Sequence, residues 1–160
     1  MRGAGCRTIW FGVESGSPAI LKKINRGITT QQVEQTIKLC KEEGIQTACS
    51  FILGIPGETV NDMKVTFEFV KKLDPDWCRF NVFIAVPGSS LYEEVMQRGL
   101  YDRVEDFVAY VKTEDFNFES ILKVQRRFLK EFNRSPKRIL RKIRREGFLT
   151  VLRRNLRLSQ

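Results

Sequence analysis

Three short apolar runs alternate with amphipathic segments along the first hundred residues. The runs are Thr8–Val13, Thr47–Leu53 and Arg79–Val86. Runs of this length, rich in β-branched and aromatic residues and bounded by glycine or proline turns, are typical of strands buried in a sheet. Because each run is separated from the next by helical patterns, the sequence predicts a β-α-β-α-β chain with parallel strands and right-handed crossovers.

The segments between the strands carry helix start signals. Pro18 follows a serine and favours the first position of a helix. Thr29 with Gln32, and Thr59 with Asp62, have the spacing of capping boxes, in which each side chain bonds to the other residue's main-chain N–H. These signals predict helices that begin after residues 17, 29 and 59.

The chain after residue 100 differs in charge from the part before it. Residues 126–160 contain 13 Lys and Arg but only two Glu, and their apolar positions follow a helical period. We therefore predict two regions, an α/β unit over residues 1–100 and a basic helical extension over 101–160. Three roles stay open for the basic part: a solvated surface, contact of residues 134–158 with an anionic membrane surface, or contact with RNA phosphates. RNA is less favoured, because no group of aromatic residues accompanies the charge.

Composition excludes several kinds of chemistry. The chain has no histidine, so Ser-His-Asp and Cys-His catalysis and imidazole zinc sites are ruled out for these residues. Its four cysteines, at positions 6, 40, 49 and 78, show no C-x-x-C spacing, so we predict free thiols, no metal site and a cytoplasmic location. No apolar run is long enough for a membrane span.

Polar or glycine-containing turns follow all three predicted strands. They cover Glu14–Ser17, Gly54–Glu58 and Val86–Ser89. Since the carboxyl ends of parallel strands meet at one edge of a sheet, a ligand site is expected there. Each turn also has a purely structural interpretation: Ser17 as an N-cap, Gly54 as a required turn residue, and Glu58 as a favourable charge at a helix start.

Three motifs together resemble one known family. GVESGSPAILKKINRGIT, FILGIPGET and PGSSLYEEV, spaced as they are here, are similar to the radical S-adenosylmethionine (SAM) superfamily, and most similar to its branch with a cobalamin-binding domain. The family fold is a partial (β/α) barrel of six parallel strands, and residues 1–100 resemble its last three. The resemblance implies a half-barrel of TIM-like type, followed by the basic extension.

The resemblance also implies a set of cofactor contacts. The first turn would contact the ribose and methionyl group of SAM, the second would pack along the adenine, and the strand over 80–85 would close the adenine side. The family's short form of the second motif has its glutamate one residue earlier than this chain. The implied contact residues are Glu14, Ser15, Ser17, Ile52, Gly54, Gly57, Glu58, Asn81 and Phe83.

One family motif is not found in this sequence. The family holds a 4Fe–4S cluster with C-x-x-x-C-x-x-C, which these 160 residues lack. We therefore expect the cluster, and any cobalamin, only in an intact enzyme in which a missing N-terminal half-barrel or a second copy pairs with the open first strand. On this interpretation the chain is the SAM-binding part of an enzyme that modifies an unactivated carbon, not catalytic alone. Two alternatives are a half-barrel that binds SAM or a nucleotide without turnover, and a non-catalytic remnant with a membrane- or RNA-binding tail.

Overall fold

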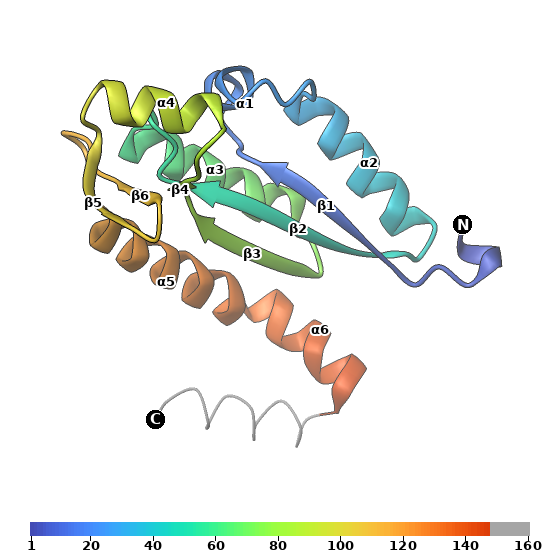
Figure 1. Ribbon diagram of the computed structural model, residues 1–160. Helices are drawn as coiled ribbons and strands as arrows, with labels where there is room; N and C mark the ends of the chain where they lie inside the picture. Colours follow the sequence, from blue (N-terminus) through green and yellow to red (C-terminus); the bar gives the residue numbers. More distant parts are fainter. Residues whose placement is uncertain (148–160) are drawn as a thin grey trace.

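The structure is a computed structural model that describes residues 1–147. It has two sheets with helices packed around the first (Figure 1). In chain order the elements are η1 (Arg2–Ala4), β1 (Thr8–Glu14), α1 (Pro18–Lys23), α2 (Thr30–Glu42), β2 (Gln46–Leu53), α3 (Val60–Leu73), β3 (Trp77–Val82), β4 (Ile84–Ala85), α4 (Ser90–Gln97), β5 (Tyr101–Glu105), β6 (Val108–Val111), α5 (Phe118–Arg134) and α6 (Pro136–Glu146).

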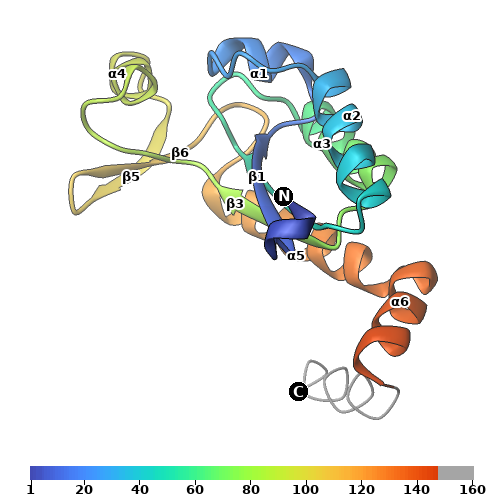
Figure 2. The same ribbon diagram turned by 90° about the vertical axis from the view of Figure 1, so that its right-hand side faces the viewer.

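The first sheet is parallel and has the order β1-β2-β3, which confirms the predicted α/β half-barrel. Figure 2 shows α2 and α3 on one side of this sheet. The residues of β2 alternate accordingly: Cys49, Phe51 and Leu53 are fully buried toward the helices, whereas Ser50 and Ile52 on the other face are partly exposed. That second face is called the inner face below, because it would face the interior of a closed barrel.

Local signals place the helices where the sequence predicts them. Thr29 and Gln32 form a complete capping box at the start of α2, and Thr59 and Asp62 form another at the start of α3. Pro18 occupies the first position of α1. These caps satisfy main-chain N–H groups that have no partner within the helix, which sets where each helix begins.

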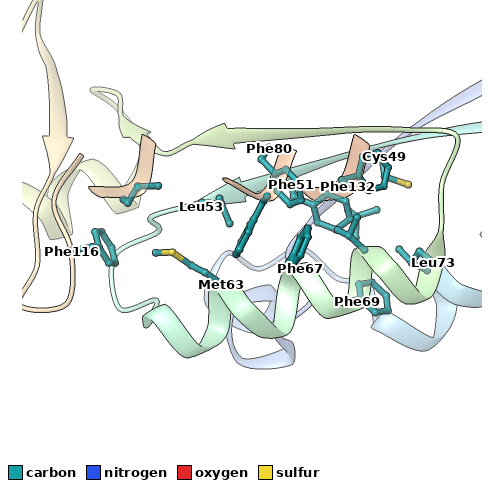
Figure 3. Packing of buried hydrophobic residues seen from close by; sticks show 14 of the residues in the cluster. Cys49, Phe51, Leu53, Met63, Phe67, Phe69, Leu73, Phe80, Phe116 and Phe132 are labelled. Carbon is teal, nitrogen blue, oxygen red and sulfur yellow. The ribbon is translucent and has the colours of Figure 1, made fainter. Parts of the chain in front are cut away.

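The hydrophobic core lies between the sheet, α3 and α5 (Figure 3). Phe67 of α3 stacks on Phe128 of α5 with 4.3 Å between ring centroids, and Phe80 of β3 meets Phe128 edge-on at 5.5 Å. Gln125 donates from its side chain to the main-chain oxygen of Phe80. Helix α5 therefore packs along β3 and belongs to the same core as the sheet.

Two sequence-based expectations need correction. The predicted strand Arg79–Val86 begins earlier and breaks near its end: β3 stops at Val82, and β4 joins a second, antiparallel sheet of order β4-β6-β5. The region 101–160 is also not purely helical, because β5 and β6 form a hairpin. The hairpin turn places Asp106 and Phe107 at positive φ, which bulky residues rarely adopt, so its sequence carries no usual turn signal.

The basic extension is only partly described. Helices α5 and α6 lie within the described residues, but the predicted amphipathic piece at 148–158 lies outside them. Among the residues described, no helix has both the length and the apolar character needed to cross a bilayer.

Candidate functional site

The carboxyl ends of the three parallel strands meet at one edge of the sheet (Figure 1). Leu53, the last residue of β2, lies opposite Val82 at the end of β3, and the N–H of Phe83 donates to the oxygen of Leu53 at 2.8 Å. Glu14, at the end of β1, lies opposite Phe51. The first two predicted turns and the end of β3 therefore come together, as expected for strands that run in parallel. We call this edge the rim.

The inner face leads up to the rim in cross-strand rows. Trp10, Ala48 and Trp77 form the first row that spans all three strands, and Ile52 lies opposite Asn81 in the row nearest to the rim. Trp10 is 65% exposed and Trp77 is 42% exposed, which is unusual for such large aromatic side chains. Among the described residues, the helices leave this face open.

Glu14 occupies a strained position beside a cation. Its φ is 71°, in the left-handed region that disfavours a side chain with a Cβ. Its carboxylate lies 3.4 Å from the guanidinium of Arg26, which also donates to the main-chain oxygen of Gly12 at 2.9 Å. The pair places one negative and one positive group at the rim end of β1.

Ser15 and Ser17 lie at the rim, but their side chains are turned to α3. Ser15 Oγ is 3.1 Å from Thr66 Oγ1 and accepts from the N–H of Ser17, and Ser17 Oγ donates to Asp62 at 2.7 Å. Both serines are buried. Their hydroxyls therefore hold the turn against α3. The predicted contacts from these two serines stay predictions.

The Gly54–Glu58 turn is held by its own glutamate. The Glu58 carboxylate is 1% exposed and accepts from the N–H groups of Gly54 at 2.6 Å and Ile55 at 3.2 Å, both through Oε2. Burial raises the pKa of Glu58 to about 7, although the two N–H donors act in the opposite direction. Glu58 thus shapes the turn from inside, whereas Gly57 is exposed.

The last three predicted residues differ in their surroundings. Ile52 and Asn81 lie opposite each other on the inner face, partly exposed and exposed respectively. Phe83 is half-buried and packs against the hydrophobic core. Ile52 and Asn81 therefore remain accessible next to the rim, and Phe83 supports it.

Comparisons with known proteins agree with this geometry. The model of the Radical SAM superfamily matches residues 1–70. The chain is 34% identical over 148 residues, 89% of its length, to an uncharacterized methyltransferase of Pyrococcus horikoshii. It is 30% identical, over 73% of its length, to the anaerobic magnesium-protoporphyrin IX monomethyl ester cyclase of Rubrivivax gelatinosus. The chain belongs to the radical SAM superfamily.

A solved structure supports the same assignment within this superfamily. The radical SAM methyltransferase TsrM from Kitasatospora setae superposes with a TM-score of 0.53 and 25% identity, over 64% of this chain and 20% of that one. A second TsrM structure is described with cobalamin and a 4Fe–4S cluster bound, in line with the predicted cobalamin-related branch. The chain spans 32% of the Pyrococcus relative's length and 20% of the Rubrivivax cyclase's.

The residues of this radical SAM chain do not fit an iron–sulfur cluster. Within the described residues, no group of three Cys, His, Asp or Glu side chains could hold a metal ion. Cys49 and Cys78 are neighbours across β2 and β3, on the helix-covered face. Burial raises the pKa of Cys49 to about 12, so it is a thiol rather than the thiolate that a cluster needs. All four cysteines are free.

One residue of the candidate site, Arg26, was not predicted from the sequence. Arg26 lies twelve positions after Glu14, in the loop that follows α1, and only the folded chain brings the two together. The sequence does show an arginine just before Gly27, within the segment INRG that the family model matches. Its spacing does not indicate which carboxylate it pairs with.

Proposed function

We propose that this chain is the SAM-binding part of a radical SAM enzyme and that the cluster ligands come from polypeptide outside this sequence. The observation that supports this most is the combination of a charged pair at the rim with an open inner face leading to it. A ligand with polar and apolar parts needs both kinds of surface, and open parallel sheets bind ligands at this end.

Glu14 and Arg26 have defined roles in this proposal. The carboxylate of Glu14 would accept hydrogen bonds from ribose hydroxyls or from the ammonium group of SAM. Arg26 pairs with Glu14, would hold its carboxylate in place, and has further N–H donors for a carboxylate. Ile52 would provide apolar contact for the adenine, beside the Gly54 turn that Glu58 holds.

SAM would serve as the radical source in the whole enzyme, as it does across this superfamily. The residues here would bind and orient it. The relatives named above include a methyltransferase and a cyclase, so we propose radical-based modification of an unactivated carbon as the reaction class. The predicted partner, a half-barrel or second copy on the open edge of β1, belongs to the same proposal, whereas membrane contact by residues 134–158 stays a prediction.

The test is binding of S-adenosylhomocysteine to the full 160-residue chain without iron, followed by amide NMR signals. We expect the signals of Glu14, Gly54 and Asn81 to shift on titration, those of α6 to stay in place, and Glu14→Gln to weaken binding. Shifts spread evenly over the surface, or binding unchanged in Glu14→Gln, would contradict the proposed site. Tight binding by the chain alone would favour the alternative of a binding module that functions without a cluster.

A further inference from the structure

A cavity lies at the opposite end of the sheet from the rim. It has a volume of about 600 Å³ and is lined by residues of α3, α5 and the start of α6. Asp74, one of its residues, directly precedes the Pro75–Asp76 segment that leads into the amino end of β3. This α3–α5–α6 groove is therefore separate from the candidate SAM site, and its volume is in the usual range for small-molecule pockets.

The groove combines an apolar floor with an excess of positive charge. Val70, Phe132 and Pro136 are among its apolar residues. Six basic side chains line it, against the two acidic residues Asp74 and Glu131. The basic residues are Lys71, Arg127, Lys130, Arg134, Lys137 and Arg138.

Three of these cations form an uncompensated row. Arg127, Lys130 and Arg134 are three and four positions apart along α5, so they share one side of the helix. Asp74 already pairs with Lys137, Arg138 and Arg141, and Glu131 lies 3.8 Å from Lys71. Among the described residues, no carboxylate pairs with the three cations of the row, so their charge is available to an anion.

The start of α6 also lies at the groove, although Pro136 has no N–H and the N–H groups of Arg138 and Ile139 already donate to the main-chain oxygen of Ser135. Ser135 precedes the helix, but its side chain makes no capping bond. Ser135 and Pro136 line the groove together with Lys137. The positive end of the α6 dipole therefore faces the groove, an arrangement that favours anions.

Arg138 gives an independent indication of a missing acceptor. Its side chain is 6% exposed, lines the groove, and stacks over the Phe132 ring with its guanidinium carbon 3.6 Å from the centroid. Its two Nη atoms donate to Asp74 and to the main-chain oxygens of Pro75 and Asp76. Its buried Nε has no acceptor in the part of the chain described. A buried donor without an acceptor is costly, so the side chain of Arg138 has an unsatisfied hydrogen-bonding group beside the groove.

We propose that the α3–α5–α6 groove binds a phosphate monoester attached to an apolar body. A phosphate monoester carries close to two negative charges and three acceptor oxygens, which suits several converging cations better than a single carboxylate does. The phosphate would lie between the α5 cations and the start of α6, and the body would lie on the apolar floor. The proposal does not depend on the proposed SAM site.

The test is calorimetric titration of the full chain with phenyl phosphate, inorganic phosphate and phenol. Phenyl phosphate should bind more tightly than either of the others, because inorganic phosphate lacks the apolar body and phenol lacks the phosphate group. Its affinity should fall as salt is added, since exposed charge pairs are screened. Phenyl phosphate binding no better than inorganic phosphate, or not at all at millimolar concentration, would overturn the proposal.

Matched variants separate the groove from general surface charge. Lys130→Gln with Arg134→Gln removes two cations of the row, whereas Lys38→Gln with Lys64→Gln removes two exposed cations elsewhere, and both pairs change net charge equally. The groove pair should weaken phenyl phosphate binding about five- to tenfold, and the control pair about twofold or less. Equal weakening in both pairs would show non-specific attraction and overturn the proposal. Circular dichroism checks that each variant is folded.

Vesicles containing phosphatidic acid distinguish the source of the phosphate. If phenyl phosphate displaces the chain from such vesicles, a lipid headgroup occupies the groove. If phenyl phosphate binds while vesicle binding is unaffected by the groove pair, the ligand is a free phosphate ester. Vesicle binding without phenyl phosphate binding would contradict the proposed groove.

Discussion

Glu58 accepts a hydrogen bond from the main-chain N–H of Gly54 at 2.6 Å, through a carboxylate that solvent scarcely reaches. The second carboxylate oxygen, Oε1, is buried and has no hydrogen-bond partner in the part of the chain described. The turn beside the candidate SAM site is therefore held by a group whose charge is poorly solvated. Its stability should depend on whether Glu58 carries a proton.

We predict that the chain becomes less stable as pH rises through the range in which Glu58 ionises. Burial raises the pKa of Glu58 from 4.5 to about 7, so between these values the folded chain holds a proton that the unfolded chain has lost. The free energy of unfolding should accordingly fall by on the order of 2 to 3 kcal/mol between about pH 5 and about pH 8. Urea unfolding at the two pH values measures this difference in the free energy of unfolding.

The variant Glu58→Gln provides the control for this pH effect. Glutamine keeps an oxygen acceptor for the two N–H groups but does not titrate, so its unfolding free energy should be nearly constant over the same range. The chain has no histidine, which leaves this range almost free of other side-chain titrations. An equal fall in stability for both proteins would show that Glu58 is not the titrating group.

Gly54→Ala should destabilise the fold more than Gly88→Ala, which replaces a glycine of similar φ. Gly54 has φ 86°, and an added Cβ would lie 2.3 Å from Ile121 Cδ1, whereas Gly88 has φ 84° and open space around it. Gly88→Ala should cost about 1 kcal/mol through backbone strain, and Gly54→Ala about 2 to 4 kcal/mol through strain plus overpacking. Similar losses in urea unfolding would show that the Ile121 contact is unimportant.

Asp74→Asn should loosen the attachment of α6. Asp74 has φ 44°, which asparagine tolerates, so the change removes mainly the charge that pairs with Arg138 and Arg141. Because Arg138 is left buried beside a neutral group, we expect a loss of about 2 to 4 kcal/mol. Glu131→Gln, which alters an exposed contact with Lys71, should change stability little. Urea unfolding measures the stability of both variants. The rate of protease cleavage near residue 135 measures how firmly α6 is attached.

Gly12→Ala should impair SAM binding while leaving the fold intact. An added Cβ would lie 2.6 Å from Glu14 Oε1 and 2.8 Å from Arg26 Nη2, both at the ends of flexible side chains that can move away. The charged pair at the rim would shift, and S-adenosylhomocysteine should bind more weakly with unchanged unfolding free energy. Unchanged affinity would argue that the Glu14–Arg26 pair does not contact the ligand.

Local signals made most of the fold readable from the sequence. The capping boxes at Thr29 and Thr59 involve residues three positions apart, and the apolar runs of β1 and β2 are short, continuous stretches of sequence, so both signals are local. The hairpin of β5 and β6 escaped prediction because its turn places Asp106 and Phe107, rather than glycine, at positive φ.

The sequence did not predict the directions of the side chains at the candidate site. Ser15 and Ser17 were predicted as ligand contacts, but their partners Thr66 and Asp62 lie on α3, more than forty residues away. The contact between Arg26 and Glu14 was likewise not predicted, because it depends on the path by which the loop after α1 returns to β1. The sequence could place these residues at the rim, but only the packing of α1 and α3 decides where each side chain points.

The contact between Asp74 and the first turn of α6 determines more than the stability of that helix. Asp74 terminates α3 just before β3 begins, and the same carboxylate holds Lys137, Arg138 and Arg141. The direction in which the backbone leaves the α/β unit is thereby set at the amino end of the strands, on the far side from Glu14. A protein domain or affinity tag fused after residue 147 would start from that far side, so a fusion there should leave access to the rim unobstructed.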